Sequence, residues 1–147
     1  MIQKLCLLLT LPVFLFVGSG WAAEYGTADE AKAMLEKAVA ALKKDKAKAL
    51  EMFTKGEGGF KDRDLYPYCG GTDGNFTAHP TLVGKSLKEL KDKAGKAFGQ
   101  EIYDKAAEGK ISEVTYMWPR SKETEPVQKV AYVTKVGDQI CGVGYYK

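Results

Sequence analysis

The chain has 147 residues, and its 22 Lys and Arg against 19 Asp and Glu give a formal net charge of +3. Lysines alternate with acidic residues instead of gathering in a basic patch, which is typical of a solvated surface and excludes an electrostatic nucleic-acid footprint. Residues 24–147 suffice for one domain with one hydrophobic core.

The first 23 residues are predicted to be a signal peptide. Lys4 supplies a positive start, residues 5–17 form an apolar run, and small residues allow cleavage after Ala22 or Ala23. The apolar run is shorter than the ~20 residues that comfortably span a bilayer, although a retained N-terminal anchor is the alternative interpretation. We therefore expect a periplasmic or secreted domain downstream.

Two helices are predicted next. Thr27 and Glu30 form a capping box, in which each side chain accepts a hydrogen bond from the backbone N–H of the other residue. The amphipathic helix that follows has one apolar stripe at three- and four-residue steps. This stripe consists of Ala31, Met34, Leu35, Ala38 and Leu42. A second, short helix is predicted from the capping residue Asp45 to the glycine-rich stop at Gly56, with Phe53 facing inward.

Beyond residue 64 the pattern changes to the two-residue alternation of strands. Strands are predicted over 65–69, 76–78, 111–118, 127–136 and 139–146, and helices over 86–90 and 96–108. Gly137 and Asp138 predict a tight hairpin between the last two strands. The order of helices, two strands, helices and three strands predicts an α+β domain with one antiparallel sheet.

Cys69 and Cys141 are the two cysteines downstream of the signal peptide. An exported protein meets an oxidising compartment, so a disulfide is the default expectation, and two buried free thiols are the alternative. The bridge requires the two Cα atoms to lie within ~7 Å of each other. A metal site is poorly supported, because only His79 could join the cysteines as a ligand, and we predict neither a metal nor a cofactor.

Polar and aromatic side chains on the predicted strands are candidate ligand contacts. Tyr66 and Tyr68 share one face of their strand. Tyr116 and Trp118 share one face of theirs. Each pair lines either a ligand pocket or the core. His79, the only histidine, has no nucleophile motif near it, so it is either a hydrogen-bond donor in a pocket or a support for its own turn, and we do not expect an enzyme.

Two cations are candidate anchors for an anionic ligand. Lys129 interrupts an apolar strand. Burying a lone ammonium is costly, so this residue should meet a carboxylate of the protein or of a ligand, unless it lies at a surface edge. Arg63 stands between Asp62 and Asp64, which makes a local ion pair the alternative to ligand binding there.

A succession of short motifs runs through the second half of the chain. They are His79-Pro80, Val83-Gly84-Lys85, Asp92-Lys93-Ala94-Gly95-Lys96, Tyr116-Met117-Trp118-Pro119, Lys129-Val130-Ala131-Tyr132-Val133 and Gly142-Val143-Gly144-Tyr145. Each motif is weak alone. In this order and spacing, the chain from about residue 27 to 147 resembles the single Cache domain, an extracytoplasmic small-molecule sensor.

The resemblance implies a long N-terminal helix packed on a five-stranded antiparallel PAS-like sheet, whose other face and loops enclose a ligand. It also implies that the first and last strands are neighbours, which would bring Cys69 and Cys141 together. By the same resemblance, we expect the ligand to be a small molecule, a short carboxylate, rather than nucleic acid. The residues expected to contact it are Tyr68, His79, Tyr116, Trp118 and Lys129.

A free-standing domain of this kind would have no second membrane helix and no output region of its own. We therefore expect it either to pass its signal to a separate membrane signalling protein, through loops around residues 70–90 that move when the ligand binds, or merely to buffer the ligand. One alternative is a non-catalytic structural or protein-interaction module whose own side chains fill the pocket. Another is a small periplasmic hydrolase, although no catalytic motif supports it.

Overall fold

The described part of the chain is residues 23–147 of a computed structural model. Its elements, in chain order, are α1 (Ala28–Lys44), α2 (Lys46–Lys55), β1 (Pro67–Gly70), β2 (Phe76–Ala78), α3 (Phe98–Lys105), β3 (Ser112–Pro119), β4 (Pro126–Val136) and β5 (Gln139–Tyr146). Except for Ala23, the predicted signal peptide lies outside the described residues. Within the described residues, no helix is long and apolar enough to cross a membrane.

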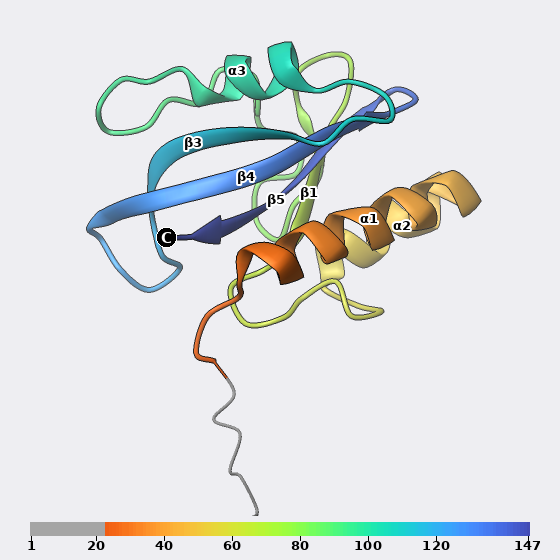
Figure 1. The fold of residues 1–147 in the computed structure, drawn as a ribbon. Coiled ribbons are helices and arrows are strands. Elements are labelled where there is room, and N and C mark those ends of the chain that lie inside the picture. Colours follow the sequence, from red (N-terminus) through yellow and green to blue (C-terminus); the bar gives the residue numbers. More distant parts are fainter. Residues whose placement is uncertain (1–22) are drawn as a thin grey trace, which may run out of the picture.

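The five strands form one sheet in the order β2-β1-β5-β4-β3, and every neighbouring pair is antiparallel. The helices α1 and α2 lie against one face of this sheet, and α3 lies over the other (Figure 1). This arrangement confirms the predicted α+β fold, with an N-terminal helix packed on a five-stranded antiparallel sheet. The last strand, β5, lies at the centre of the sheet, between β1 and β4.

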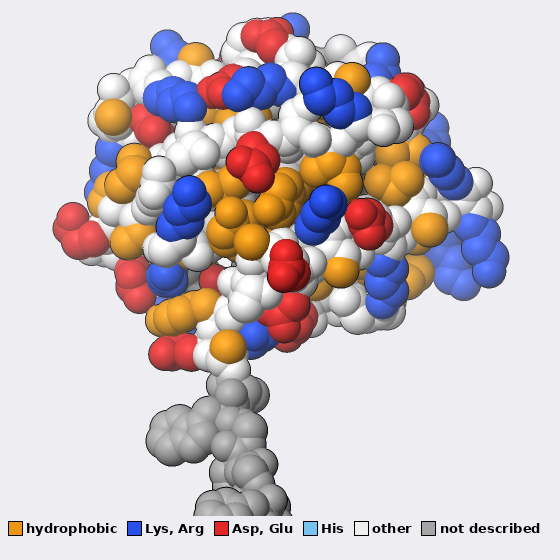
Figure 2. Space-filling model, viewed as in Figure 1, with side chains coloured by type: hydrophobic (Ala, Val, Ile, Leu, Met, Phe, Trp, Pro, Cys, Tyr) orange, Lys and Arg blue, Asp and Glu red, His pale blue; other side chains and the backbone are white. Residues whose placement is uncertain are grey.

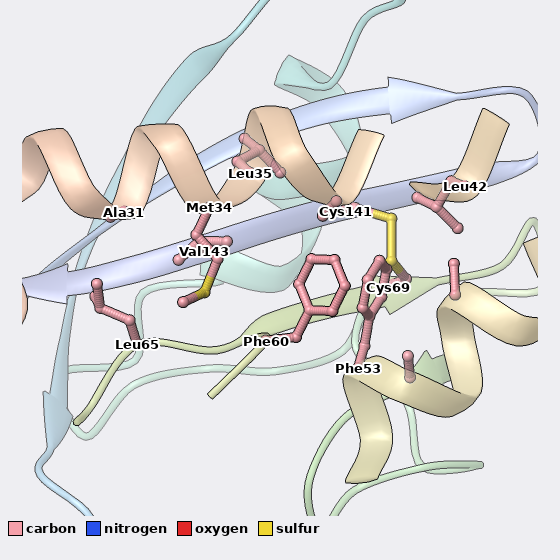
Figure 3. Close-up of a cluster of buried hydrophobic side chains, with 13 residues drawn as sticks. Ala31, Met34, Leu35, Leu42, Phe53, Phe60, Leu65, Cys69, Cys141 and Val143 are labelled. Carbon is pink, nitrogen blue, oxygen red and sulfur yellow. A yellow bond between two sulfur atoms is a disulfide. The ribbon is translucent and has the colours of Figure 1, made fainter. Parts of the chain in front are cut away.

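The core between the helices and the sheet forms as the sequence pattern predicts. The Thr27 hydroxyl accepts from the N–H of Glu30 at 3.3 Å, and the Thr27 N–H donates to Glu30 Oε2 at 2.8 Å, so the capping box is present. All residues of the predicted stripe on α1 are buried, and Asp45 caps α2. Phe53 and Phe60, whose rings meet edge to face at 4.6 Å, complete this core (Figure 3).

Cys69 on β1 and Cys141 on β5 form a disulfide inside the same core (Figure 3). The two residues face each other directly across the antiparallel pair, with their Cα atoms 4.1 Å apart. The predicted bridge is therefore present, and it ties the first strand of the sheet to the last.

The helix predicted over 86–90 is wrong, because this segment forms turns. Two of its backbone N–H groups bond outside the segment. The carbonyl oxygen of Gly74 accepts from the N–H of Leu87 at 2.8 Å and from that of Lys88 at 3.0 Å. These long-range bonds hold the segment against the loop between β1 and β2.

Two other elements differ from their predicted bounds. The strand β1 begins at Pro67, two residues late, because the N–H of Leu65 closes a tight turn instead of joining the sheet. The helix predicted over 96–108 is shorter at both ends, and at its start the N–H of Lys96 bonds the Asp92 side chain. The three C-terminal strands lie within one residue of their predicted bounds.

A second core lies on the other face of the sheet, under α3 and the segment between β2 and α3. Phe98 and Ile102 from α3 meet Val114 and Val133 from the sheet in this core. On the outside, Figure 2 shows Lys and Arg interspersed with Asp and Glu around an apolar area between α3 and α1. The candidate site lies within the second core.

Candidate ligand-binding site

The five side chains predicted to contact a ligand line one cavity in the second core. They are Tyr68 on β1, His79 directly after β2, Tyr116 and Trp118 on β3, and Lys129 on β4. The cavity measures about 30 Å³, which is room for about one water molecule. We call it the inner cavity. Its walls also include Tyr66, Phe76, Leu82, Leu87, Phe98 and Gly144.

Strand register and two glycines bring these side chains together. Tyr116 pairs with Lys129 across β3 and β4, so both point to the same side of the sheet. A Cβ atom at Gly144 of β5 would lie 2.5 Å from Lys129 Cε. A Cβ atom at Gly142 would lie 2.5 Å from the hydroxyl of Tyr68. The two glycines therefore let the long side chains of neighbouring strands lie across β5.

Lys129 is buried without an acidic partner. Only 4% of the residue is exposed. No carboxylate of residues 23–147 lies within ion-pair distance of its Nζ. The Nζ atom instead lies 5.2 Å from the ring centre of Tyr66 and 4.7 Å from that of Tyr146. Burial lowers the pKa of Lys129 to about 8, although the negative charge of Asp64 opposes this shift.

His79 supports the loop that follows β2. Its Nδ1 atom accepts from the N–H of Thr81 at 3.0 Å and from that of Leu82 at 3.1 Å. A nitrogen that accepts carries no proton, so the proton of the neutral ring is on Nε2. Burial, and then the charge of Lys129, lower the pKa of His79 to about 4. The ring is therefore neutral at neutral pH, and its Nε2–H group remains as a donor on the cavity wall.

The Tyr68 hydroxyl is a further polar group without a partner. It is shielded from solvent and makes no hydrogen bond within the part of the chain that the structure describes. Burial raises the pKa of this hydroxyl, so it stays protonated. Leaving such a group unpaired costs about 1–3 kcal/mol. Because the ammonium, the imidazole N–H and this hydroxyl are all donors, the inner cavity favours an acceptor and above all an anion.

Stacked aromatic rings form another wall of the cavity. Phe98 of α3 stacks on Tyr116 with ring centres 4.0 Å apart, and Trp118 meets Phe98 edge to face at 5.5 Å. Asp92 holds this wall on β3. Its carboxylate accepts from the N–H of Met117 at 3.2 Å and from two N–H groups of its own turn, which lowers the pKa of Asp92. The Asp-x-x-Gly-Lys motif thus fastens the segment before α3 to the strand that carries the aromatic pair.

A wider cavity of about 540 Å³ lies outside the inner one. We call it the outer cavity. Tyr66, His79, Leu82 and Trp118 line both spaces and so form the partition between them.

Arg63 lines the outer cavity and not the inner one. Its guanidinium pairs with Asp62 at 2.9 Å and with Glu30 at 2.7 Å, and it donates to the carbonyl oxygen of Tyr25 at 2.9 Å. The local ion pair that its acidic neighbours suggested is therefore formed. Within residues 23–147, no group of three or more His, Cys, Asp or Glu side chains is placed to hold a metal ion.

A family model for the Cache domain matches residues 29–147. The chain belongs to the Cache domain family. Cache domains are sensory ligand-binding modules. In this chain, the inner cavity lies between the sheet and the segment that connects β2 to α3. A comparison with curated proteins finds no match.

Solved structures of Cache sensor domains share the fold. A methyl-accepting chemotaxis protein from Vibrio parahaemolyticus RIMD 2210633 is 25% identical, with a TM-score of 0.63 over 80% of this chain and 86% of that one. A periplasmic sensor domain of a chemotaxis protein is 25% identical, with a TM-score of 0.61 over 80% and 88%. A Cache chemosensory domain described for its carboxylic acid recognition is 23% identical, with a TM-score of 0.56 over 78% and 84%.

Some residues of this Cache domain's site carry weak or no signals in the sequence. Tyr66 shares a strand face with Tyr68, and this alternation points to the cavity that both residues line. Phe98 faces inward in the predicted helix, but nothing in the sequence indicates that it stacks on Tyr116. The role of Gly144 has no local signal, because it depends on a lysine of the neighbouring strand.

Proposed function

We propose that this Cache domain is an extracytoplasmic sensor that binds a small organic carboxylate in its inner cavity. The observation that carries the proposal is the buried ammonium of Lys129, which has no acidic partner within residues 23–147. A lone buried cation is costly, and a ligand carboxylate would supply the missing charge. The structural likeness to a Cache domain described for carboxylic acid recognition supports the same ligand class.

Each of the five predicted contacts has a role in this proposal. Lys129 pairs with the carboxylate, and the hydroxyl of Tyr68 and the Nε2–H of His79 donate hydrogen bonds to it. Tyr116 and Trp118 form the wall beside it, with their rings packed on α3. The small volume of the cavity limits what can enter to a compact anionic group unless side chains of the partition move.

The response to the ligand would reach the surface through His79. Its ring contacts the cavity on one side and holds the loop at Thr81 and Leu82 on the other. A ligand that bonds Nε2–H favours one position of the ring and thereby one state of the loop. We propose that a separate membrane signalling protein reads this surface.

The proposed compartment is the periplasm. The predicted signal peptide implies export. The disulfide between Cys69 and Cys141 supports the same compartment, because such bridges persist in oxidising environments.

The test is thermal melting of the purified protein with a panel of small carboxylates, amines, amino acids and purines. A carboxylate at about 100 times its dissociation constant should add ~2.7 kcal/mol, which raises the melting temperature by several degrees. Lys129→Met should abolish this shift. Without ligand, the same variant should melt a few degrees higher than the parent, because an apolar side chain replaces an unpaired buried cation.

Lys135→Met is the matched control, since this lysine lies exposed on the same strand and should leave the ligand response unchanged. A carboxylate response that persists in Lys129→Met would contradict the proposal. Melting that ignores the whole panel would favour a protein-interaction module whose pocket is filled by its own side chains.

A further inference from the structure

The segment directly before α1, residues 23–26, is attached to the surface of the domain (Figure 1). We call it the strap. Its Tyr25 side chain lines the outer cavity. The N–H of Gly26 donates to Asp64 Oδ1 at 2.7 Å, and a Cβ atom at Gly26 would overlap the side chain of Leu65. The strap is therefore fixed at the end that joins α1, and the contacts of Tyr25 decide whether the rest of it stays attached.

Arg63 holds the backbone of the strap. Its guanidinium donates to the carbonyl oxygens of Tyr25 at 2.9 Å and Ala23 at 3.3 Å. It also pairs with Glu30 of the capping box at 2.7 Å. The φ angle of Arg63 is 54°, in the left-handed region that residues other than glycine rarely adopt. Such a conformation persists only where the surrounding contacts hold it, and here those contacts include the strap.

Arg120, in the loop between β3 and β4, holds the side chain of Tyr25. Its guanidinium lies 4.0 Å from the ring centre of Tyr25 and 4.7 Å from that of Tyr146, at the end of β5. Within residues 23–147 it forms no ion pair, and its Nη1 atom is shielded from solvent without a hydrogen-bond partner. The attraction of the two rings is therefore the main interaction of this cation.

Tyr146 links Arg120 to Lys129 of the inner cavity. Its ring centre lies 4.7 Å from Lys129 Nζ as well as from Arg120 Cζ, so two cations share one ring. Its hydroxyl donates to the carbonyl oxygen of Pro119 at 2.8 Å, which fixes the loop directly before Arg120. Two positive charges so close to one partly buried ring repel each other. The charge of Lys129 therefore weakens the hold of Arg120 on the strap.

We propose that the strap is a conformational switch that the charge of Lys129 controls. While Lys129 is charged and unpaired, Arg120 holds Tyr25 weakly and the strap opens readily. An anion that pairs with Lys129 reduces the repulsion across Tyr146, so Arg120 binds both rings more tightly and the strap closes on the outer cavity. The use of this switch by a ligand rests on the function proposed above, whereas the coupling between Lys129 and the strap is a property of the chain alone.

Exchange of the Gly26 amide with deuterium, followed by NMR on the purified protein, measures opening of the strap, because this N–H bonds Asp64 in the attached state. Arg120→Gln should speed the exchange about two- to fivefold, as expected for the loss of one exposed cation–π contact. Lys129→Met removes the charge without any ligand, so it should slow the exchange by a similar factor. Lys135→Met, exposed on the same strand, is the matched control and should leave the rate unchanged.

A double variant identifies the route of the coupling. In the Arg120→Gln background, Lys129→Met should have no effect on the Gly26 exchange, because the cation that it acts on is absent. An effect that persists in this background would overturn the coupling through Arg120. Exchange that is unchanged or faster in Lys129→Met alone would overturn it as well.

A third comparison separates this switch from the carboxylate sensor. A carboxylate that raises the melting temperature of the parent should also slow its Gly26 exchange, and it should do neither in Lys129→Met. If the variants behave as expected and no acid of the panel binds, the switch stands and the carboxylate sensor fails. If an acid binds through Lys129 without slowing the Gly26 exchange, the sensor stands and the switch fails.

Discussion

Lys129 has an unusual position for an ammonium group. Its side chain is buried among aromatic rings, without the carboxylate that normally accompanies a buried cation. The domain therefore gives up some stability in the unliganded state, and a ligand that restores the charge balance recovers it. A buried charge that lowers the stability of the unliganded protein is common at ligand-binding sites.

The pKa of Lys129 near 8 predicts a pH limit for carboxylate binding. The proton is bound below about pH 8 and lost above it, so affinity for a carboxylate should fall about tenfold per pH unit above that value. The unliganded domain should respond in the opposite sense. Its folded-state pKa lies below the ordinary 10.5, so this group adds stability as the pH rises from about 8 to 10.5.

Titration calorimetry between pH 6.5 and 9.5 measures the first effect, and urea denaturation of the unliganded protein measures the second. Lys129→Met should remove the second effect and serves as its control. Affinity that stays constant up to pH 9.5 would contradict a role for the Lys129 charge.

At the scale of elements, β5 determines how the site is assembled. Its glycines at 142 and 144 leave space for Tyr68 and Lys129 on the cavity side. On the opposite side Cys141 joins Cys69, so the same strand is fastened to β1 by a covalent bond. The cavity and the disulfide thus share one strand pair, and the bridge fixes the register on which the cavity depends.

Removing the disulfide tests this coupling. The bridge spans 72 positions of sequence, a loop worth about 4 kcal/mol in the chain-entropy account. The double variant Cys69→Ala/Cys141→Ala should lower the free energy of unfolding in urea by about 2–4 kcal/mol. A reducing agent should destabilise the parent by a similar amount and leave the double variant unaffected. An equal effect of the reductant on both proteins would contradict this account.

Elements whose signals are local could be predicted from the sequence. The capping box at Thr27, the stripe on α1 and the hairpin at Gly137 depend on residues a few positions apart. The segment 86–90 could not be predicted, because the N–H groups of Leu87 and Lys88 bond the carbonyl of Gly74, more than ten residues away. Local propensity favoured a helix there, and tertiary hydrogen bonds overrode it.

Part of the candidate site could be predicted from the alternation of residues along the strands and from the resemblance to a known family. Alternation places Tyr116 and Trp118 on one strand face, and a lone lysine in an apolar strand marks Lys129. Which strands lie side by side is not a local property, so only the resemblance indicated that these residues would meet. The close approach of Gly144 to Lys129 and the stacking of Phe98 on Tyr116 depend on the packing of distant segments, and the sequence carries no sign of either.

At the scale of the whole molecule, the proposed signal is a change in the segment between β2 and α3. Hydrogen exchange with a saturating carboxylate should slow the amides of Thr81 and Leu82, which bond His79, and the amide of Leu87, which bonds Gly74. The turn at 106–110, also exposed but outside the site, should change little. Equal protection of both segments, or a response that Lys129→Met retains, would argue against signalling through this loop.

The central place of β5 has a further consequence for how the protein is made. During synthesis, β1 leaves the ribosome long before residues 139–146, so the middle of the sheet stays vacant until they emerge. A sheet that pairs strands so distant in sequence folds slowly, because the chain between β1 and β5 must close into a loop before the two strands can pair. The sheet therefore closes only after β5 has left the ribosome and has paired with β1 and β4.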